Sequence, residues 1–201
     1  MKVGVIALQG AVSEHIEAVK RAFLEMDVKG EAIQVKGKRE LKEVQGLIIP
    51  GGESTTISRL IEKSGLSQMI KDKAFAKMPI MGTCAGCILL AKEGDLEVNK
   101  TDTNLLGLMD MKVARNAFGR QRESFETKLE IKGFDSPYKA VFIRAPAIEK
   151  IWSECETLAT FEDKIVLARQ DNLIAAAFHP ELTNDTRVHK LLLNMIMNVD
   201  F

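Results

Sequence analysis

The pentapeptide Gly82-Thr83-Cys84-Ala85-Gly86 joins the end of a short apolar run at residues 79–82 to the start of a helical pattern at residues 84–91. A strand that turns into a helix this abruptly, with a glycine two positions on either side of the turn residue, is typical of a nucleophile elbow. A side chain at either glycine would crowd the strand or the helix. The elbow places its central residue at the carboxyl end of the strand, where open α/β folds form their sites. The segment therefore predicts an α/β fold with Cys84 as a candidate nucleophile.

Short apolar runs alternate with helical patterns in the rest of the first half of the chain. This alternation is typical of βαβ units, in which a parallel sheet is covered by helices on both faces. Ser13 is the expected N-cap of the first helix. The predicted strands lie at residues 2–8, 32–35, 46–49, 79–82 and 173–178, and the predicted helices at about 13–27, 56–63 and 84–91 and from about 185 toward the C-terminus.

Residues 92–169 have a different sequence pattern, with polar stretches and short runs of alternating apolar and polar residues such as 109–113 and 128–131. Alternation with a period of two is typical of strands that bury one face, so we expect a small antiparallel or edge portion here. We find no repeat, linker or low-complexity segment in the sequence. A single domain over residues 1–201 is therefore expected, with a mostly parallel central sheet.

The composition disfavours several classes of partner. The 201 residues include 28 Lys+Arg and 28 Asp+Glu, so the chain has no net charge that would attract nucleic acid or an anionic membrane surface. The apolar runs are far shorter than the ~18 residues that a membrane span needs. Three cysteines are too few, and odd in number, for a disulfide framework. We expect a cytoplasmic protein without nucleic-acid or membrane partners.

Cys84 is a better candidate for chemistry than most cysteines. A thiol at a helix N-terminus can have a pKa between roughly 3.5 and 7.5, which makes the thiolate available at neutral pH. Two alternatives remain open: Cys84 and Cys87 form a C-x-x-C pair that is found in thiol redox proteins, and with Cys155 and a histidine they could bind zinc. Zinc is the weaker alternative because strong zinc motifs have two close pairs. We expect Cys87 to face the core.

Three histidines are candidates for the base that a cysteine nucleophile needs. His179 directly follows the apolar run at 173–178, so we expect it at the same edge of the sheet as Cys84. Glu181 stands two residues later, and in an extended segment both side chains would point to the same side, so that the carboxylate fixes the tautomer of the imidazole. We expect His189 to be solvated beside the apolar stripe of the last helix. For His15, a surface role and a partner contact are equally open.

Acyl transfer also needs donors for the oxyanion, commonly the backbone N–H of the residue after the nucleophile and one from a neighbouring loop. Ala85 is the first candidate. Gly52, in the Pro50-Gly51-Gly52 segment after another predicted strand, is the second, although an ordinary Pro-Gly turn is the preferred interpretation of that segment taken alone.

Arginines near predicted strand ends are candidates for binding a substrate carboxylate, because the guanidinium fork makes two parallel hydrogen bonds to it. Chemistry alone does not choose among these arginines, and an exposed salt-bridging surface is the default interpretation of each. They are Arg115, Arg120, Arg122 and Arg144.

The elbow and the distal His179-Pro180-Glu181 together resemble the Cys-His-Glu triad of class I glutamine amidotransferases, which have a flavodoxin-like three-layer fold. Five segments, spread from the first strand toward the last helix, narrow the resemblance to the glutaminase subunits of pyridoxal 5′-phosphate synthase. They are Val5-Ile6-Ala7-Leu8-Gln9-Gly10-Ala11-Val12 with Glu14-His15, Gly51-Gly52-Glu53-Ser54-Thr55-Thr56, Gly82-Thr83-Cys84-Ala85-Gly86, Arg115-Asn116-Ala117-Phe118-Gly119-Arg120-Gln121 and Phe142-Ile143-Arg144-Ala145-Pro146.

The resemblance implies a glutaminase that hydrolyses L-glutamine to L-glutamate and ammonia and passes the ammonia to a (β/α)₈-barrel synthase subunit. It implies that Cys84 is the nucleophile and that His179 and Glu181 complete the triad. It also implies activation by the partner, with Gln9–His15 as our expected contact surface. The sequence has no nucleotide-binding motif, so we expect no cofactor, and we assign no metal ligands. The residues that it places around glutamine are Gly52, Glu53, Ser54, Arg115, Ile143 and Arg144.

Overall fold

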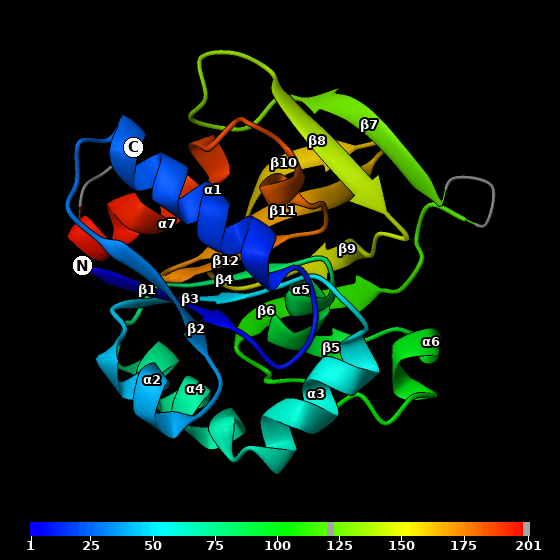
Figure 1. Ribbon diagram of the computed structural model, residues 1–201. Coiled ribbons are helices and arrows are strands. Elements are labelled where there is room, and N and C mark those ends of the chain that lie inside the picture. The colour runs from blue at the N-terminus through cyan, green and yellow to red at the C-terminus, as the bar shows by residue number, and fades with distance from the viewer. Residues whose placement is uncertain (120–122, 199–201) are drawn as a thin grey trace.

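A mixed β-sheet runs through the middle of the molecule, with helices on both of its faces (Figure 1). The computed structural model describes residues 1–119 and 123–198. The strands of the main sheet in these residues are β1 (Lys2–Ile6), β2 (Glu31–Val35), β3 (Gly46–Ile49), β4 (Ile80–Thr83), β5 (Ala91–Gly94), β6 (Met109–Ala114), β9 (Ala147–Ile151), β10 (Glu156–Phe161), β11 (Lys164–Gln170) and β12 (Leu173–Ala176). Their order is β2-β1-β3-β4-β12-β11-β9-β6-β5, with β10 paired to β11.

The parallel half of the sheet consists of β2, β1, β3, β4 and β12. Because parallel strands all end at the same edge, the residues that follow β1, β3, β4 and β12 lie close together there. This edge carries the loop after β3, the elbow after β4 and the histidine after β12. The parallel sheet and its covering helices confirm the predicted α/β class.

Alternate side chains of the parallel strands enter two separate cores. Val3 and Val5 of β1 pack into one core and Ile6 into the other, as expected for the two-residue period of a strand. The first core is covered by α1 (Val12–Glu25) and α7 (Arg187–Met197), which pack against each other. On the opposite side lie α2 (Lys38–Glu43), α3 (Ser54–Lys63), α4 (Leu66–Phe75), α5 (Ala85–Leu90) and α6 (Leu96–Asn99). The result is the three-layer arrangement that the resemblance implied.

The antiparallel strands form a larger part of the sheet than the small edge portion we expected. β11 pairs antiparallel with β12, β9 and β10, and β9 pairs antiparallel with β6. A separate hairpin of β7 (Ser124–Leu129) and β8 (Tyr138–Ile143) lies above this region (Figure 1), and the rings of Phe125 and Phe142 stack across it with their centroids 4.7 Å apart.

Two local expectations were wrong. The helix α1 begins at Val12 with Ala11 at its N-cap, so Ser13 does not cap it; the Ser13 hydroxyl donates to Glu14 Oε2 at 3.0 Å instead. The first strand ends at Ile6 rather than residue 8, since the chain already turns there toward α1. Among residues 1–119 and 123–198, none of the helices has the length and apolar character that crossing a bilayer requires.

Candidate active site

The elbow forms as the sequence predicts. Cys84 lies between β4 and α5 with φ +48° and ψ −103°, a strained conformation of the kind that clusters at functional sites, and its N–H donates to the Ala176 carbonyl at 2.8 Å. Both glycines are required, because a Cβ on Gly82 would lie 2.4 Å from the Gly86 carbonyl oxygen. One on Gly86 would lie 2.0 Å from the Ile49 carbonyl oxygen. The elbow thus presents Cys84 at the carboxyl edge of the sheet.

Cys84 and His179 meet at this edge. Both pack against Gly51, where an added Cβ would lie 2.5 Å from His179 Cε1 and 3.3 Å from Cys84 Cβ. Each residue is 8% exposed. Burial alone would lower the pKa of His179, but hydrogen bonds to Cys84 and Glu181 outweigh burial and raise it to about 10. The sulfur and the imidazole therefore lie where an ion pair between thiolate and imidazolium can form.

Glu181 fixes the orientation of the imidazole. Its Oε1 accepts a hydrogen bond from His179 Nδ1 at 2.7 Å, and the His179 backbone N–H donates to the Val141 carbonyl at 2.8 Å. The predicted pairing is present, but its geometry differs from the extended segment we assumed. Residues Pro180–Leu182 form a single turn of 3₁₀ helix, η1, and this turn brings Glu181 back under the ring of His179.

The other two histidines are not where the sequence placed them. His15 and His189 are both fully buried, so the solvated position expected for His189 and both roles weighed for His15 are wrong. Nδ1 of His15 is 3.1 Å from Nε2 of His189, and Nε2 of His15 is 3.3 Å from Glu181 Oε2. Burial lowers the pKa of both imidazoles, that of His189 to about 3. The cause of their burial is tertiary, because α1 and α7 pack face to face.

Cys84 and His179 line a cavity of about 360 Å³. All the residues expected around a substrate also lie on its wall, together with the oxyanion candidate Ala85: Gly52, Glu53, Ser54, Arg115, Ile143 and Arg144. Sequence reasoning missed four further lining residues, Gln9, Ile88, Asn116 and Pro146. Of these, Gln9, Asn116 and Pro146 lie in motifs that the resemblance had singled out, and Ile88 does not. Arg120 and Arg122 lie outside the described residues.

Glu53 anchors the loop that carries Gly52. Its carboxylate accepts hydrogen bonds from the backbone N–H groups of Thr55 at 3.2 Å and Thr56 at 2.6 Å, and so caps helix α3. Partial burial acts to raise the pKa of Glu53, but hydrogen bonds from the two threonines outweigh it and lower the pKa to about 2. Glu53 also pairs with Arg115 at 3.3 Å. Glu53 is therefore ionised and holds Arg115 at the cavity wall.

Gln9, Ser54 and Arg144 contribute polar groups to the residues that line the cavity. Gln9 Oε1 accepts the Glu53 N–H at 3.0 Å, which ties the segment before α1 to the loop after β3. The Ser54 hydroxyl is buried without a hydrogen-bond partner among the described residues. Arg144 has φ +42°, and its N–H donates to the Glu123 carbonyl at 2.6 Å. These groups can bind a small polar molecule next to the sulfur of Cys84.

Cys87 does not share the environment of Cys84. Its side chain is fully buried in the apolar core below the sheet, as predicted, and burial strongly raises the pKa of its thiol. A thiol redox pair requires a second reactive thiolate, so this burial disfavours the redox alternative. In the part of the chain that the structure describes, no three His, Cys, Asp or Glu side chains are grouped in a way that could hold a metal ion.

Comparisons with known proteins show the family of the chain. The model of the SNO glutamine amidotransferase family matches residues 5–198. The chain is 51% identical to pyridoxal 5′-phosphate synthase subunit PdxT of Methanosarcina acetivorans over 98% of its own length and all of that protein, and 54% identical to PdxT of Methanococcoides burtonii over the same shares. A crystal structure of a glutamine amidotransferase is 42% identical, with a TM-score of 0.88 over 97% of this chain and 98% of that one. The chain belongs to the SNO glutamine amidotransferase family.

Proposed function

We propose that this chain is the glutaminase subunit of pyridoxal 5′-phosphate synthase: it hydrolyses L-glutamine to L-glutamate and ammonia and supplies the ammonia to a barrel synthase subunit. Relatives that carry the name PdxT match it over nearly their whole length. The observation that carries the proposal for this chain is the arrangement of Cys84, His179 and Glu181 beside a cavity with arginines on its wall.

The first half of the reaction is acyl transfer to sulfur. The Cys84 thiolate attacks the carboxamide carbon of glutamine, and the oxyanion accepts hydrogen bonds from the N–H groups of Ala85 and Gly52. The imidazolium of His179 gives its Nε2 proton to the leaving nitrogen, so the C–N bond breaks, ammonia departs and a thioester remains. Glu181 keeps the Nδ1 proton in place throughout and stabilises the imidazolium.

The second half is hydrolysis of the thioester. Neutral His179 takes a proton from a water molecule as that water attacks the thioester carbon, and the same N–H groups hold the second oxyanion. Collapse of this intermediate breaks the C–S bond and releases glutamate. The thiolate and the imidazolium are then restored, so the cycle needs no cofactor.

Substrate recognition follows from the charges on the cavity wall. The guanidinium groups of Arg115 and Arg144 suit the α-carboxylate of glutamine. Glu53 positions Arg115, and the unpartnered hydroxyl of Ser54 is available to a substrate polar group. Gly52 and Ile143 complete the wall next to Cys84.

The synthase partner would contact the segment Gln9–His15. Ser13 and Glu14 are exposed there, whereas His15 is buried and takes no part in such a contact. Because Gln9 contacts the loop that carries Gly52, a partner bound to this segment can orient the Gly52 N–H, the second oxyanion donor.

The three cysteines are unpaired, which supports a reducing, cytoplasmic location.

The test is glutamate release from glutamine by the wild-type chain with and without a barrel synthase, beside Cys84→Ala and Cys87→Ala. We expect release that rises with the partner, disappears in Cys84→Ala and survives in Cys87→Ala. Loss of activity in Cys87→Ala with retention in Cys84→Ala would contradict the proposal and favour chemistry at the other thiol.

A further inference from the structure

Behind the triad, a chain of buried polar side chains continues away from the cavity. His15 on α1 approaches Glu181 Oε2 at 3.3 Å and Thr83 Oγ1 at 3.0 Å through its Nε2, and His189 on α7 at 3.1 Å through its Nδ1. All four side chains belong to residues that are 5% exposed or less. The carboxylate of Glu181 therefore accepts a hydrogen bond from His179 at Oε1, while its buried Oε2 has no hydrogen-bond partner among the described residues and lies 3.3 Å from His15 Nε2.

The hydrogen-bonding capacities of these groups fix which nitrogens carry protons. Nε2 of His15 makes its hydrogen bond to Thr83 Oγ1 and lies 3.3 Å from an ionised carboxylate, which only accepts, so this nitrogen carries the proton of His15 and Nδ1 is an acceptor. His189 then donates to that acceptor from its own Nε2. In the opposite pair of tautomers, His15 carries its proton on Nδ1 and donates it to Nε2 of His189. A lone pair of His15 would then face the carboxylate, and His189 would carry its proton on Nδ1, a buried nitrogen without a partner among the described residues.

Both histidines are neutral in this arrangement. Burial lowers the pKa of each imidazole, so each carries one N–H at neutral pH. A neutral His15 gives Glu181 a donor without adding a positive charge next to the imidazolium of His179. This combination suits an orienting contact, because it restrains the carboxylate and leaves its charge free to stabilise the imidazolium.

We propose that His15 is a positioning residue of the glutaminase site: its Nε2–H fixes the Glu181 carboxylate, so that Glu181 holds the imidazole of His179 toward Cys84, and His189 fixes the tautomer of His15. This inference rests on the function proposed above. Through Thr83, the residue before Cys84, the same nitrogen of His15 also contacts the strand that carries the nucleophile. His15 thereby links both halves of the triad to helix α1.

The first test measures kcat and KM for glutamine hydrolysis in the complex with the barrel synthase. His15→Leu removes the donor, and we expect kcat to fall about 10- to 100-fold, as for other residues that orient a catalytic group, while KM stays within about twofold. His15→Gln places an amide N–H near the position of Nε2 and should recover most of the activity. Val19→Ala, one turn further along α1, should destabilise the fold but keep the wild-type kcat.

The second test measures the rate at which iodoacetamide alkylates Cys84 in the complex without glutamine, with Cys84→Ala as the background. We expect slower alkylation in His15→Leu and a rate near wild type in His15→Gln and Val19→Ala. A wild-type kcat and alkylation rate in His15→Leu would overturn the inference, as would equal losses in His15→Leu, His15→Gln and Val19→Ala. If wild type releases no Cys84-dependent glutamate, the proposed function fails, while the alkylation rates still decide the role of His15.

Discussion

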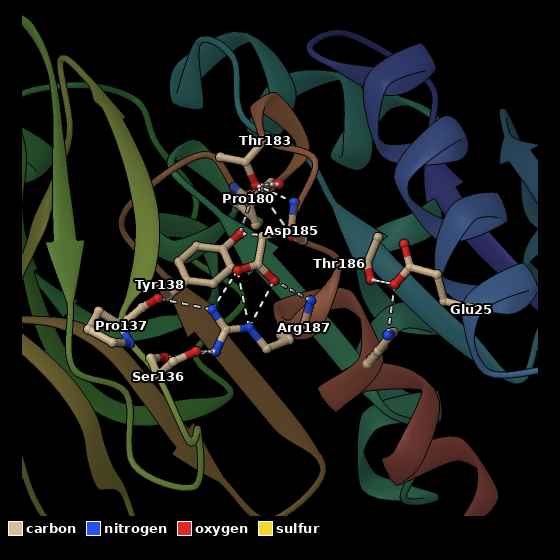
Figure 2. Close-up of polar contacts among 10 residues, drawn as sticks. Glu25, Ser136, Pro137, Tyr138, Pro180, Thr183, Asp185, Thr186 and Arg187 are labelled. Atoms are coloured by element: carbon tan, nitrogen blue, oxygen red, sulfur yellow. Dashed lines mark hydrogen bonds and ion pairs between the residues drawn. The ribbon is translucent and has the colours of Figure 1, made fainter.

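Two polar clusters flank the short turn η1, and they differ in the kind of group that they contain. On one side, four buried residues follow one another: the nitrogens of His179 and His15 lie next to the Glu181 carboxylate, and a nitrogen of His189 lies next to a nitrogen of His15. On the other side, Arg187 pairs with Asp185 through two of its nitrogens and donates to the Ser136 carbonyl at 2.7 Å (Figure 2). The side chains of Arg187 and Asp185 are 29% and 26% exposed.

The two clusters therefore suit different roles: the first takes part in proton transfer, and the second anchors helix α7. The buried cluster contains the imidazole of His179 beside Cys84 and, behind it, two imidazoles that burial keeps neutral. The Arg187 cluster contains a guanidinium that never loses its charge, and it ties α7 to the segment before β8 while Tyr138 lies below the same guanidinium at 5.7 Å. Only the first cluster, through His179, can transfer a proton to a substrate.

The largest expected effect compares the two carboxylates. Glu181→Gln removes the charge that stabilises the imidazolium and disturbs the tautomer of His179, so kcat should fall by about 10⁴, as in other triads. Asp185→Asn weakens an ion pair that has no contact with the triad, so kcat should stay within about threefold. Steady-state kinetics of both variants in the complex would test this. A large loss of kcat in Asp185→Asn would contradict the assignment of the Arg187 cluster to anchoring alone.

The next effect compares the arginines. Arg144→Ala and Arg115→Ala each remove a charge-assisted hydrogen bond to the substrate, worth about 1.5–3 kcal/mol, so KM for glutamine should rise about 10- to 100-fold. Arg187→Ala should lower the melting temperature and leave KM unchanged. Initial rates over a range of glutamine concentrations give KM, and equal KM values in all three variants would contradict the assigned substrate contacts.

The smallest effect concerns Glu53, which lines the cavity but anchors a helix. Glu53→Ala should cost about 1 kcal/mol of unfolding free energy at neutral pH, a typical value for an N-cap with a half-exposed side chain. The pKa of Glu53 is about 2 in the fold against an ordinary 4.5, so its contribution is fully present above pH 4.5 and is lost as the pH falls toward 2. Urea unfolding of wild type and variant at several pH values measures this. A difference that grows in acid would have the wrong sign.

The elbow and the order of strands were predictable because local chemistry determines them. Two glycines around Cys84 and a histidine directly after an apolar strand place both reactive groups at one sheet edge by topology alone. The hairpin between β10 and β11 was harder to predict, since its turn residues Glu162 and Asp163 have φ +47° and +61° without the glycine that usually signals such a turn.

The burial of His15 and His189 was not predictable from periodicity. Each residue lies on a helix with a clear apolar stripe, and a histidine beside such a stripe is expected to face solvent. The two helices pack against each other over the sheet, which widens the buried face of both and encloses the two rings. A contact between residues 174 positions apart leaves no local trace in the sequence.

The most direct test of the central claim uses 6-diazo-5-oxo-L-norleucine, a glutamine analogue whose diazoketone alkylates an activated nucleophile in its binding site. The complex is treated with it, and the modified atom is mapped by tandem mass spectrometry of the tryptic peptide 78–92, which contains both Cys84 and Cys87. We predict a single adduct on Cys84 that glutamine suppresses and that His179→Ala lacks. An adduct on Cys87, or none on Cys84 while the complex still releases glutamate from glutamine, would contradict the account.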